Sequence, residues 1–200
     1  MAAHMTMRER QRLETLTALH RSATALVREG GLAAATIDAI TAQTGIARRT
    51  FFNYYASKED AILGTTAPMV PEEAMAQFLE SESGTDEFTR TITLIGAVMR
   101  STREAEVDVG EIRRLLAEFP ELSARQQQHS AAAEKLVESA ISTHIPDSSE
   151  APARALVLLA TSVLRYAYSI DPVSIPTADS PVVQVAIDTF RTILDRVGRP

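Results

Sequence analysis

The stretch TIDAITAQTGIARRTFFNYYASKEDAIL, residues 36–63, decides the expected fold of the N-terminal part of the chain. Thr36 can cap a short helix, because a threonine hydroxyl accepts a hydrogen bond from the unpaired backbone N–H groups of a first helical turn. Gly45 then supplies a turn, since glycine adopts a positive φ without steric cost, and residues from about 47 to 54 form another short helix. Two short helices joined by a glycine-containing turn are a helix-turn-helix.

The residues on either side of this stretch predict the flanking helices. Apolar residues recur at helical spacing over residues 8–28, and the glycine pair 30–31 then stops the helix. Ser57 heads a capping box with the acid three residues later, so a fourth helix starts there or one residue on. Pro68 and Pro71 are expected to stop or kink that helix, because proline lacks the N–H and clashes with the preceding turn.

Helical patterns continue through the rest of the chain, and no run of alternating β-branched residues bounded by turns predicts a strand. We therefore expect an all-α protein. Further helices are predicted at residues 72–81, 86–103, 105–118, 121–144, 152–170 and 181–197.

Composition indicates a soluble globular protein and excludes several kinds of site. The 200 residues are 45% hydrophobic, which suffices for a core without disulfides. There is no cysteine, and the four histidines lack the spacing of metal ligands, so we expect no metal and no cofactor. No apolar run is long enough to span a bilayer and no secretion signal is recognised, so a cytoplasmic location is expected. The opening MAAHM, residues 1–5, is typical of a cloning remnant and is left out of the fold prediction.

The net charge of −6 conceals an asymmetry along the chain. Residues 1–60 carry eight Lys and Arg against six Asp and Glu, whereas the rest carries twelve against twenty. A mildly basic segment attached to an acidic body can still present a local patch to phosphate groups.

The second helix of a helix-turn-helix can enter the major groove of DNA, which assigns a role to the polar residues of the stretch. Five residues of this helix are predicted to meet DNA: Arg48, Arg49, Thr50, Asn53 and Tyr54. Arginine can bind guanine edges or phosphates, whereas Thr50, Tyr54 and Lys58 suit phosphate oxygens that fix orientation without reading sequence.

Apolar residues of the same stretch are expected to build the small core against the first helix. They are Ile37, Ile40, Ile46 and Phe51. Phe51, Phe52 and Tyr55 are better explained by helical packing than as stacking platforms for bases.

Residues 36–63 resemble the DNA-binding domain of TetR-family transcriptional regulators, and the first helix extends the resemblance to about residue 10. The family pattern has threonine before the second helix, Thr-Phe-Tyr-x-Tyr-Phe through the recognition helix and Ser-Lys-Glu-x-Leu-Leu after it. The resemblance implies phosphate contacts from Thr36, Thr50, Tyr54 and Lys58. The sequence departs from the pattern at four positions, with Thr41 and Thr44 replacing alanines, Ala47 replacing serine and Phe52 standing where tyrosine is commonest.

The resemblance also implies a homodimer that binds double-stranded operator DNA, with repression as the family's default. The dimer is expected to form through residues 152–170 and 181–197, each of which has an apolar helical stripe that could equally be ordinary core. A palindromic operator requires two recognition helices about one DNA turn apart, which a dimer supplies.

Similar regulators hold a small-molecule effector among the helices that follow the DNA-binding domain. The predicted pocket residues are Phe88, Ile92, Ile95, Met99, Leu116, Phe119, His129 and Tyr166, with Arg125 among their neighbours. Each of them could instead be plain core, and the sequence leaves these readings open. The expected domains are a helix-turn-helix DNA-binding domain at 6–56 and a helical regulatory domain at 57–200 that includes the connecting fourth helix.

The sequence bears on two other classes of function. An enzyme is disfavoured, because no nucleophile with a recognisable base, phosphate loop or paired-carboxylate motif is found. A constitutive helical module that binds DNA or protein without an inducer stays as the alternative.

Overall fold

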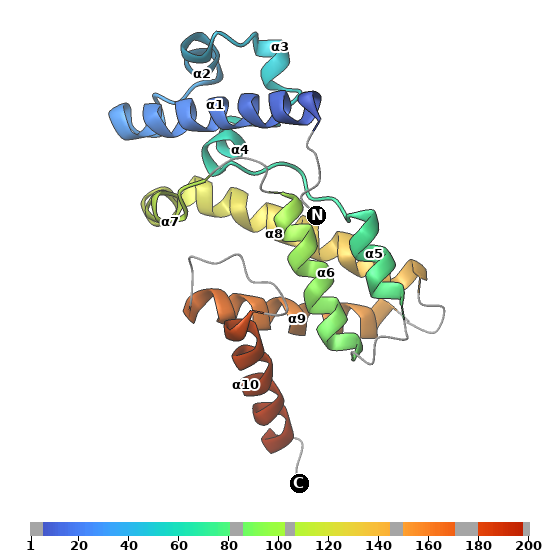
Figure 1. Ribbon diagram of the computed structural model, residues 1–200. Coiled ribbons are helices and arrows are strands. Elements are labelled where there is room, and N and C mark those ends of the chain that lie inside the picture. Colours follow the sequence, from blue (N-terminus) through green and yellow to red (C-terminus); the bar gives the residue numbers. More distant parts are fainter. Residues whose placement is uncertain (1–5, 81–85, 103–106, 145–149, 171–179, 198–200) are drawn as a thin grey trace. The chain divides into compact units, whose positions relative to one another are not determined.

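The computed structural model describes residues 6–80, 86–102, 107–144, 150–170 and 180–197. These ranges form ten helices and no strand, so the prediction of an all-α protein is confirmed (Figure 1). The helices are α1 (Met7–Gly30), α2 (Ile37–Thr44), α3 (Arg48–Phe51), α4 (Lys58–Leu63), α5 (Glu72–Leu79), α6 (Glu87–Ser101), α7 (Val109–Glu118), α8 (Pro120–His144), α9 (Glu150–Ile170) and α10 (Pro181–Val197). The segment MAAHM and the predicted helix ends at 81, 103 and 105 lie outside the described residues.

The chain forms two compact units, which divide it differently from the predicted domains. One unit consists of Met1–Ala67 and Thr102–Gln128, and the other of Pro68–Ser101 and His129–Pro200. The fourth helix therefore belongs to the same unit as α1, α2, α3, α7 and the start of α8, and α8 contributes residues to both units. The functional division at residues 56 and 57 stays a prediction.

In the first unit, α1 is the long helix against which the helix-turn-helix packs. Its start is fixed by a capping box in which the Thr6 hydroxyl accepts from the Glu9 backbone N–H, while the Glu9 carboxylate accepts from the Thr6 N–H. Figure 1 shows α2 and α3 along one side of α1 and α4 along the other. The buried side of α1 carries Leu16, Leu19, Ala23 and Val27.

The predicted core of the helix-turn-helix is confirmed. Ile40 and Phe51 are fully buried, and Ile37 and Ile46 pack against the same cluster. Tyr55 joins them, with its hydroxyl donating to the carbonyl of Leu16 at 3.2 Å.

Phe52 does not belong to this core, so its predicted packing role is wrong. Its side chain is 47% exposed and forms an edge-to-face contact with the Phe51 ring, with ring centroids 5.5 Å apart. The reason is the length of α3, which has four residues and ends at Phe51, so only one of two adjacent rings can face α1.

The fourth helix ends earlier than predicted from Pro68 and Pro71. It has six residues and is capped at its C-terminus by Gly64, whose φ of 64° is in the left-handed region. The backbone N–H of Gly64 turns back to the carbonyl of Ala61, which closes the last turn. Glycine therefore stops α4 four residues before Pro68 is reached.

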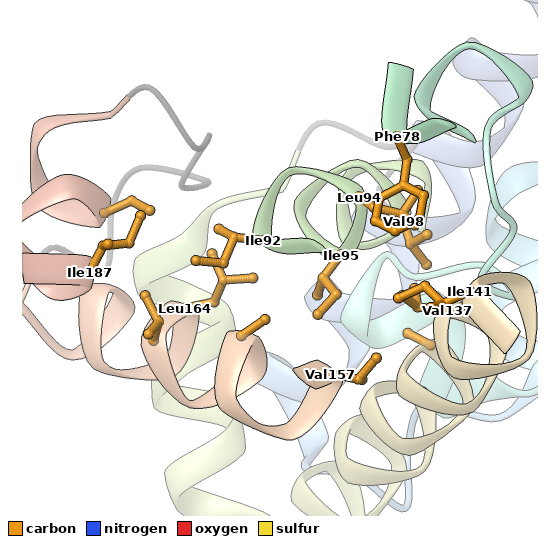
Figure 2. Close-up of a cluster of buried hydrophobic side chains, with 14 of the residues drawn as sticks. Phe78, Ile92, Leu94, Ile95, Val98, Val137, Ile141, Val157, Leu164 and Ile187 are labelled. Atoms are coloured by element: carbon orange, nitrogen blue, oxygen red, sulfur yellow. The ribbon is translucent and has the colours of Figure 1, made fainter. Parts of the chain in front are cut away.

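The second unit is built around α6, which carries apolar residues on more than one face. In Figure 2, Ile92 points toward Leu164 and Ile187, whereas Leu94 and Val98 lie beside Phe78. Helices α5, α9 and α10 contribute to this core with the C-terminal part of α8. The central position predicted for the helix at 86–103 is thus confirmed for its described residues.

Candidate nucleic-acid interface

The recognition helix is held by one buried ring and presents its charges to solvent. Phe51 is fully buried at the end of α3, while Arg48, Arg49 and Asn53 are exposed. Thr50 and Tyr54 are partly buried beside them. Arg48 to Thr50 share the one turn of α3 and Asn53 and Tyr54 follow it directly, which keeps these five predicted residues in one short segment.

Arg48 is already engaged by two neighbours in the protein alone. Its Nη1 donates to Oδ1 of Asp38, which is exposed at the start of α2. Its guanidinium also lies 5.8 Å from the centroid of the exposed Phe52 ring, a cation–π distance. Arg48 is therefore oriented by an acid and an aromatic ring, and DNA would have to compete with Asp38 for it.

Two predicted phosphate contacts lie at helix starts, and each has a hydrogen bond within the protein. The Thr36 hydroxyl accepts from the Ala39 N–H at 3.1 Å, which caps α2 as the sequence predicted. The Lys58 Nζ donates to the carbonyl of Leu32 at 2.9 Å. An ammonium group has three donors, so this single bond leaves Lys58 able to contact a phosphate.

Ala47, which replaces the serine of the family pattern, leaves the recognition helix without a side-chain N-cap. Ala47 is the N-cap residue of α3, and no side chain accepts from the free N–H groups of that turn. Serine at this position would supply an acceptor. Thr41 and Thr44, the other departures inside α2, donate to the carbonyls of Ile37 and Ile40 one turn earlier.

Two arginines that the sequence analysis did not assign lie near the predicted DNA contacts. Arg8 and Arg12, on α1, line a hollow of about 870 Å³ together with Thr50 and Tyr54. The guanidinium of Arg12 lies 5.6 Å from the centroid of the Tyr54 ring. The sequence signal is a run of basic residues at positions 8, 10 and 12. Arg8 and Arg12 are four residues apart, which places them on one face of a helix.

The eight residues predicted to line an effector pocket divide between the two cores. Leu116 and Phe119 pack against the core of the first unit. Ile92 and Ile95 are buried in the core of the second, and Phe88 packs against it. The other three, Met99, His129 and Tyr166, belong to the second unit, where Met99 and Tyr166 are each 40% exposed.

Two hollows found among the described residues lie away from that predicted set. Neither of two hollows of about 490 and 870 Å³ in the first unit is lined by any of the eight residues. Arg125, predicted as a neighbour of the pocket, instead forms an ion pair with Asp60 in the first unit.

The helices predicted to form the dimer, α9 and α10, carry several exposed apolar side chains. They are Leu158, Leu159, Tyr166, Ile170, Val185, Ile193 and Leu194, each at least 38% exposed. Single exposed apolar residues are ordinary, but a group on two neighbouring helices marks a surface available for association.

Among the described residues, no helix is both long and apolar enough to cross a membrane. Within the same part of the chain, no group of three or more His, Asp or Glu side chains is gathered as a metal site requires.

A comparison with protein families identifies the domain built by α1 to α4. Residues 19–63 match the model of the bacterial regulatory proteins of the TetR family. No match to a curated protein was found. The matched segment includes the buried core residues Ile40, Phe51 and Tyr55 and the exposed arginines of α3. The N-terminal segment is therefore similar to the DNA-binding domain of bacterial regulatory proteins of the TetR family, which indicates a DNA-binding transcription regulator.

Proposed function

We propose that the protein is a cytoplasmic, ligand-responsive repressor that binds a palindromic operator as a homodimer and leaves it when a small molecule binds. The observation that carries this proposal is the match over residues 19–63 together with the exposed Arg48 and Arg49 above a fully buried Phe51. A short recognition segment held by one ring can enter the major groove without disturbing its own core.

Seven residues take the DNA-binding roles in this proposal: Thr36, Arg48, Arg49, Thr50, Asn53, Tyr54 and Lys58. Arg48 and Arg49 read base edges, because an exposed guanidinium can bind guanine through two parallel hydrogen bonds. Thr36, Thr50, Tyr54 and Lys58 fix the protein on the phosphate backbone.

Dimerisation through residues 152–170 and 181–197 is supported by the exposed apolar side chains of α9 and α10. A second copy would remove Leu158, Ile193 and Leu194 from water, each of which is at least 50% exposed in the single chain. Burying such side chains stabilises a complex by about 25 cal/mol for each Å² of apolar surface removed from water.

One observation favours a different account of the predicted effector site. Ile92 and Ile95 are buried in a continuous core, which favours the alternative of a constitutive DNA-binding module without an inducer. Met99, on the same helix and 40% exposed, is the predicted residue best placed to admit a ligand. Met99→Trp should therefore abolish release by any effector found in a small-molecule screen while leaving operator binding intact. Loss of operator binding in this variant, or release that persists in it, would contradict this placement of the effector.

The proposed DNA-binding roles are tested by comparing the affinity for the region upstream of the protein's own gene with that for random duplexes. About 6–10 phosphate contacts per operator would reduce the affinity on the order of 10³–10⁵-fold between about 50 and 200 mM salt. Arg48→Ala or Arg49→Ala should cost about 1–3 kcal/mol of binding free energy and relax preference at one operator position, whereas Lys58→Ala should weaken all sequences alike. A flat salt dependence, or equal binding to all duplexes, would contradict the proposal.

A further inference from the structure

The hollow between α1 and the recognition segment has two kinds of wall. One wall contains Thr50 and Tyr54, both already proposed to contact phosphate. No described residue accepts a hydrogen bond from either hydroxyl, so both can donate outward. The facing wall is the start of α1, where Arg8 and Arg12 line the same hollow of about 870 Å³.

The two arginines are placed by the helical repeat and by one contact. Arg8 and Arg12 are four residues apart, so they share a face of α1, whereas Arg10 lies off that face and does not line the hollow. The Arg12 guanidinium lies over the Tyr54 ring, 5.6 Å from its centroid, and this cation–π contact orients the side chain at the hollow. Arg12 is thus oriented toward Tyr54, which directly follows the recognition helix.

One acid lies in the same hollow, but its carboxylate is already occupied. Glu9 accepts from the backbone N–H and the hydroxyl of Thr6, at 2.7 and 2.9 Å. These bonds to Thr6 lower the pKa of Glu9, which keeps the carboxylate charged. With Arg8 and Arg12 against Glu9, the ionic side chains of this hollow carry one net positive charge.

We infer that this hollow receives the phosphate backbone of one DNA strand, so that the first two turns of α1 form a second wall of the DNA interface. Arg8 and Arg12 are phosphate-contacting residues here, and Tyr54 positions Arg12. The inference rests on the proposed function, because it extends the contact made by α3. Both arginines hold the strand's charge rather than read its bases, since the guanidinium fork matches phosphate oxygens from any sequence.

The test uses the full-length protein with a duplex that the wild type selects from a random library, and with a scrambled duplex of the same composition. Affinity is measured by fluorescence anisotropy from about 50 to 200 mM salt. Arg8→Ala and Arg12→Ala should each weaken binding to both duplexes by the same factor, and should reduce the slope of log K against log salt by about 1. Arg12→Lys should restore the slope. Arg10→Ala is the matched control and should leave it unchanged.

Thermal unfolding of each variant separates lost contact from lost fold, and a variant that unfolds below the assay temperature is replaced by its Lys counterpart. Slopes for Arg8→Ala and Arg12→Ala equal to that for Arg10→Ala would overturn the inference, while Arg48→Ala still weakening selection would leave the proposed function standing. A change of sequence preference with an unchanged slope would also overturn it. A wild type that selects no sequence would contradict the proposed function itself.

Discussion

Asp60 of α4 and Arg125 of α8 form a two-point ion pair, with Nε and Nη2 of the arginine each 2.7 Å from a different carboxylate oxygen. Asp60 is 2% exposed, and its hydrogen bond to Arg125 raises the pKa of the arginine. The pair fastens the helix that follows the recognition segment to α8, a single helix whose later residues belong to the second unit. Asp60 and Arg125 both lie in the first unit, so the pair ties α4 to the start of α8 within that unit.

Removing the arginine of this pair should be far more costly than removing a similar arginine at the surface. Arg125→Leu removes the guanidinium that neutralises the buried Asp60 carboxylate, which should lower the free energy of unfolding by about 3 kcal/mol or more. The matched control is Arg191→Leu, whose partner Asp86 and own side chain are both 50% exposed, so the loss should be at most about 1 kcal/mol. Urea unfolding of both variants measures the difference, and equal losses would show that Asp60 is not desolvated in solution.

Gly64 should tolerate alanine much less well than Gly45 does. Both have a positive φ, 64° and 69°, so each substitution carries backbone strain of about 1–2 kcal/mol. A Cβ at Gly64 would also lie 2.6 Å from Cγ2 of Val107 and 3.2 Å from Nδ1 of His20, whereas nothing lies within 4 Å of one at Gly45. We expect Gly64→Ala to cost about 1–3 kcal/mol more than Gly45→Ala in thermal or urea unfolding. A smaller loss at Gly64 would contradict the close approach.

His20 should make the first unit less stable in mild acid. Burial lowers the pKa of His20, against opposing contributions from its bond to the Ala61 carbonyl, 2.9 Å from Nδ1, and from the nearby Glu111. The unfolded chain then binds a proton more readily than the folded one, so the free energy of unfolding falls as the pH drops below about 6.5. One proton gives a slope of at most about 1.4 kcal/mol per pH unit.

The comparison for this pH dependence is His20→Asn, whose amide can donate to Ala61 in place of Nδ1 but does not titrate. Urea unfolding from about pH 7.5 to 5 should show a shallower loss of stability for the variant than for the wild type. Parallel curves would mean that His20 does not carry the effect.

Ala47→Ser should stabilise the recognition helix. The α3 N-cap has no side-chain acceptor, and a serine hydroxyl there would accept from a free N–H of the first turn, a gain of about 0.5–2 kcal/mol. Ala42→Ser is the control, because Ala42 is exposed inside α2, where serine gains no cap and has a lower helix propensity. The variants are compared by urea unfolding and by amide exchange in α3. Equal or lower stability for Ala47→Ser would contradict the capping gap.

The sequence predicted the features that depend on neighbouring residues. The cap at Thr36, the turn at Gly45 and the core around Ile40 and Phe51 all follow from local spacing, and the structure confirms them. At Ser57 the cap is confirmed, since its hydroxyl accepts from the Asp60 N–H, but the Asp60 carboxylate binds Arg125 where a capping box was predicted. The predicted end of α4 near Pro68 is wrong, because the left-handed Gly64 already completes the C-terminal cap of the helix.

Contacts between segments far apart in the sequence could not be predicted from local spacing. Asp60 and Arg125 are 65 residues apart, and no spacing rule connects them. Periodicity identified the apolar sides of α6, but a side chain such as Ile95 has the same pattern whether it lines a cavity or fills a core. Phe52 shows the corresponding limit in a very short helix, where the pattern is too brief to decide which ring is buried.

The central claim is that α3 reads a DNA sequence on behalf of a dimer, and selection from a library of randomised duplexes tests it most directly. The wild-type protein should enrich one inverted repeat whose half-site centres are about one DNA turn, or 10 base pairs, apart. The Arg48→Ala and Arg49→Ala variants should each lose preference at one position in both halves of that repeat. Enrichment of no sequence, or of the same sequence with undiminished preference by both variants, would contradict the account.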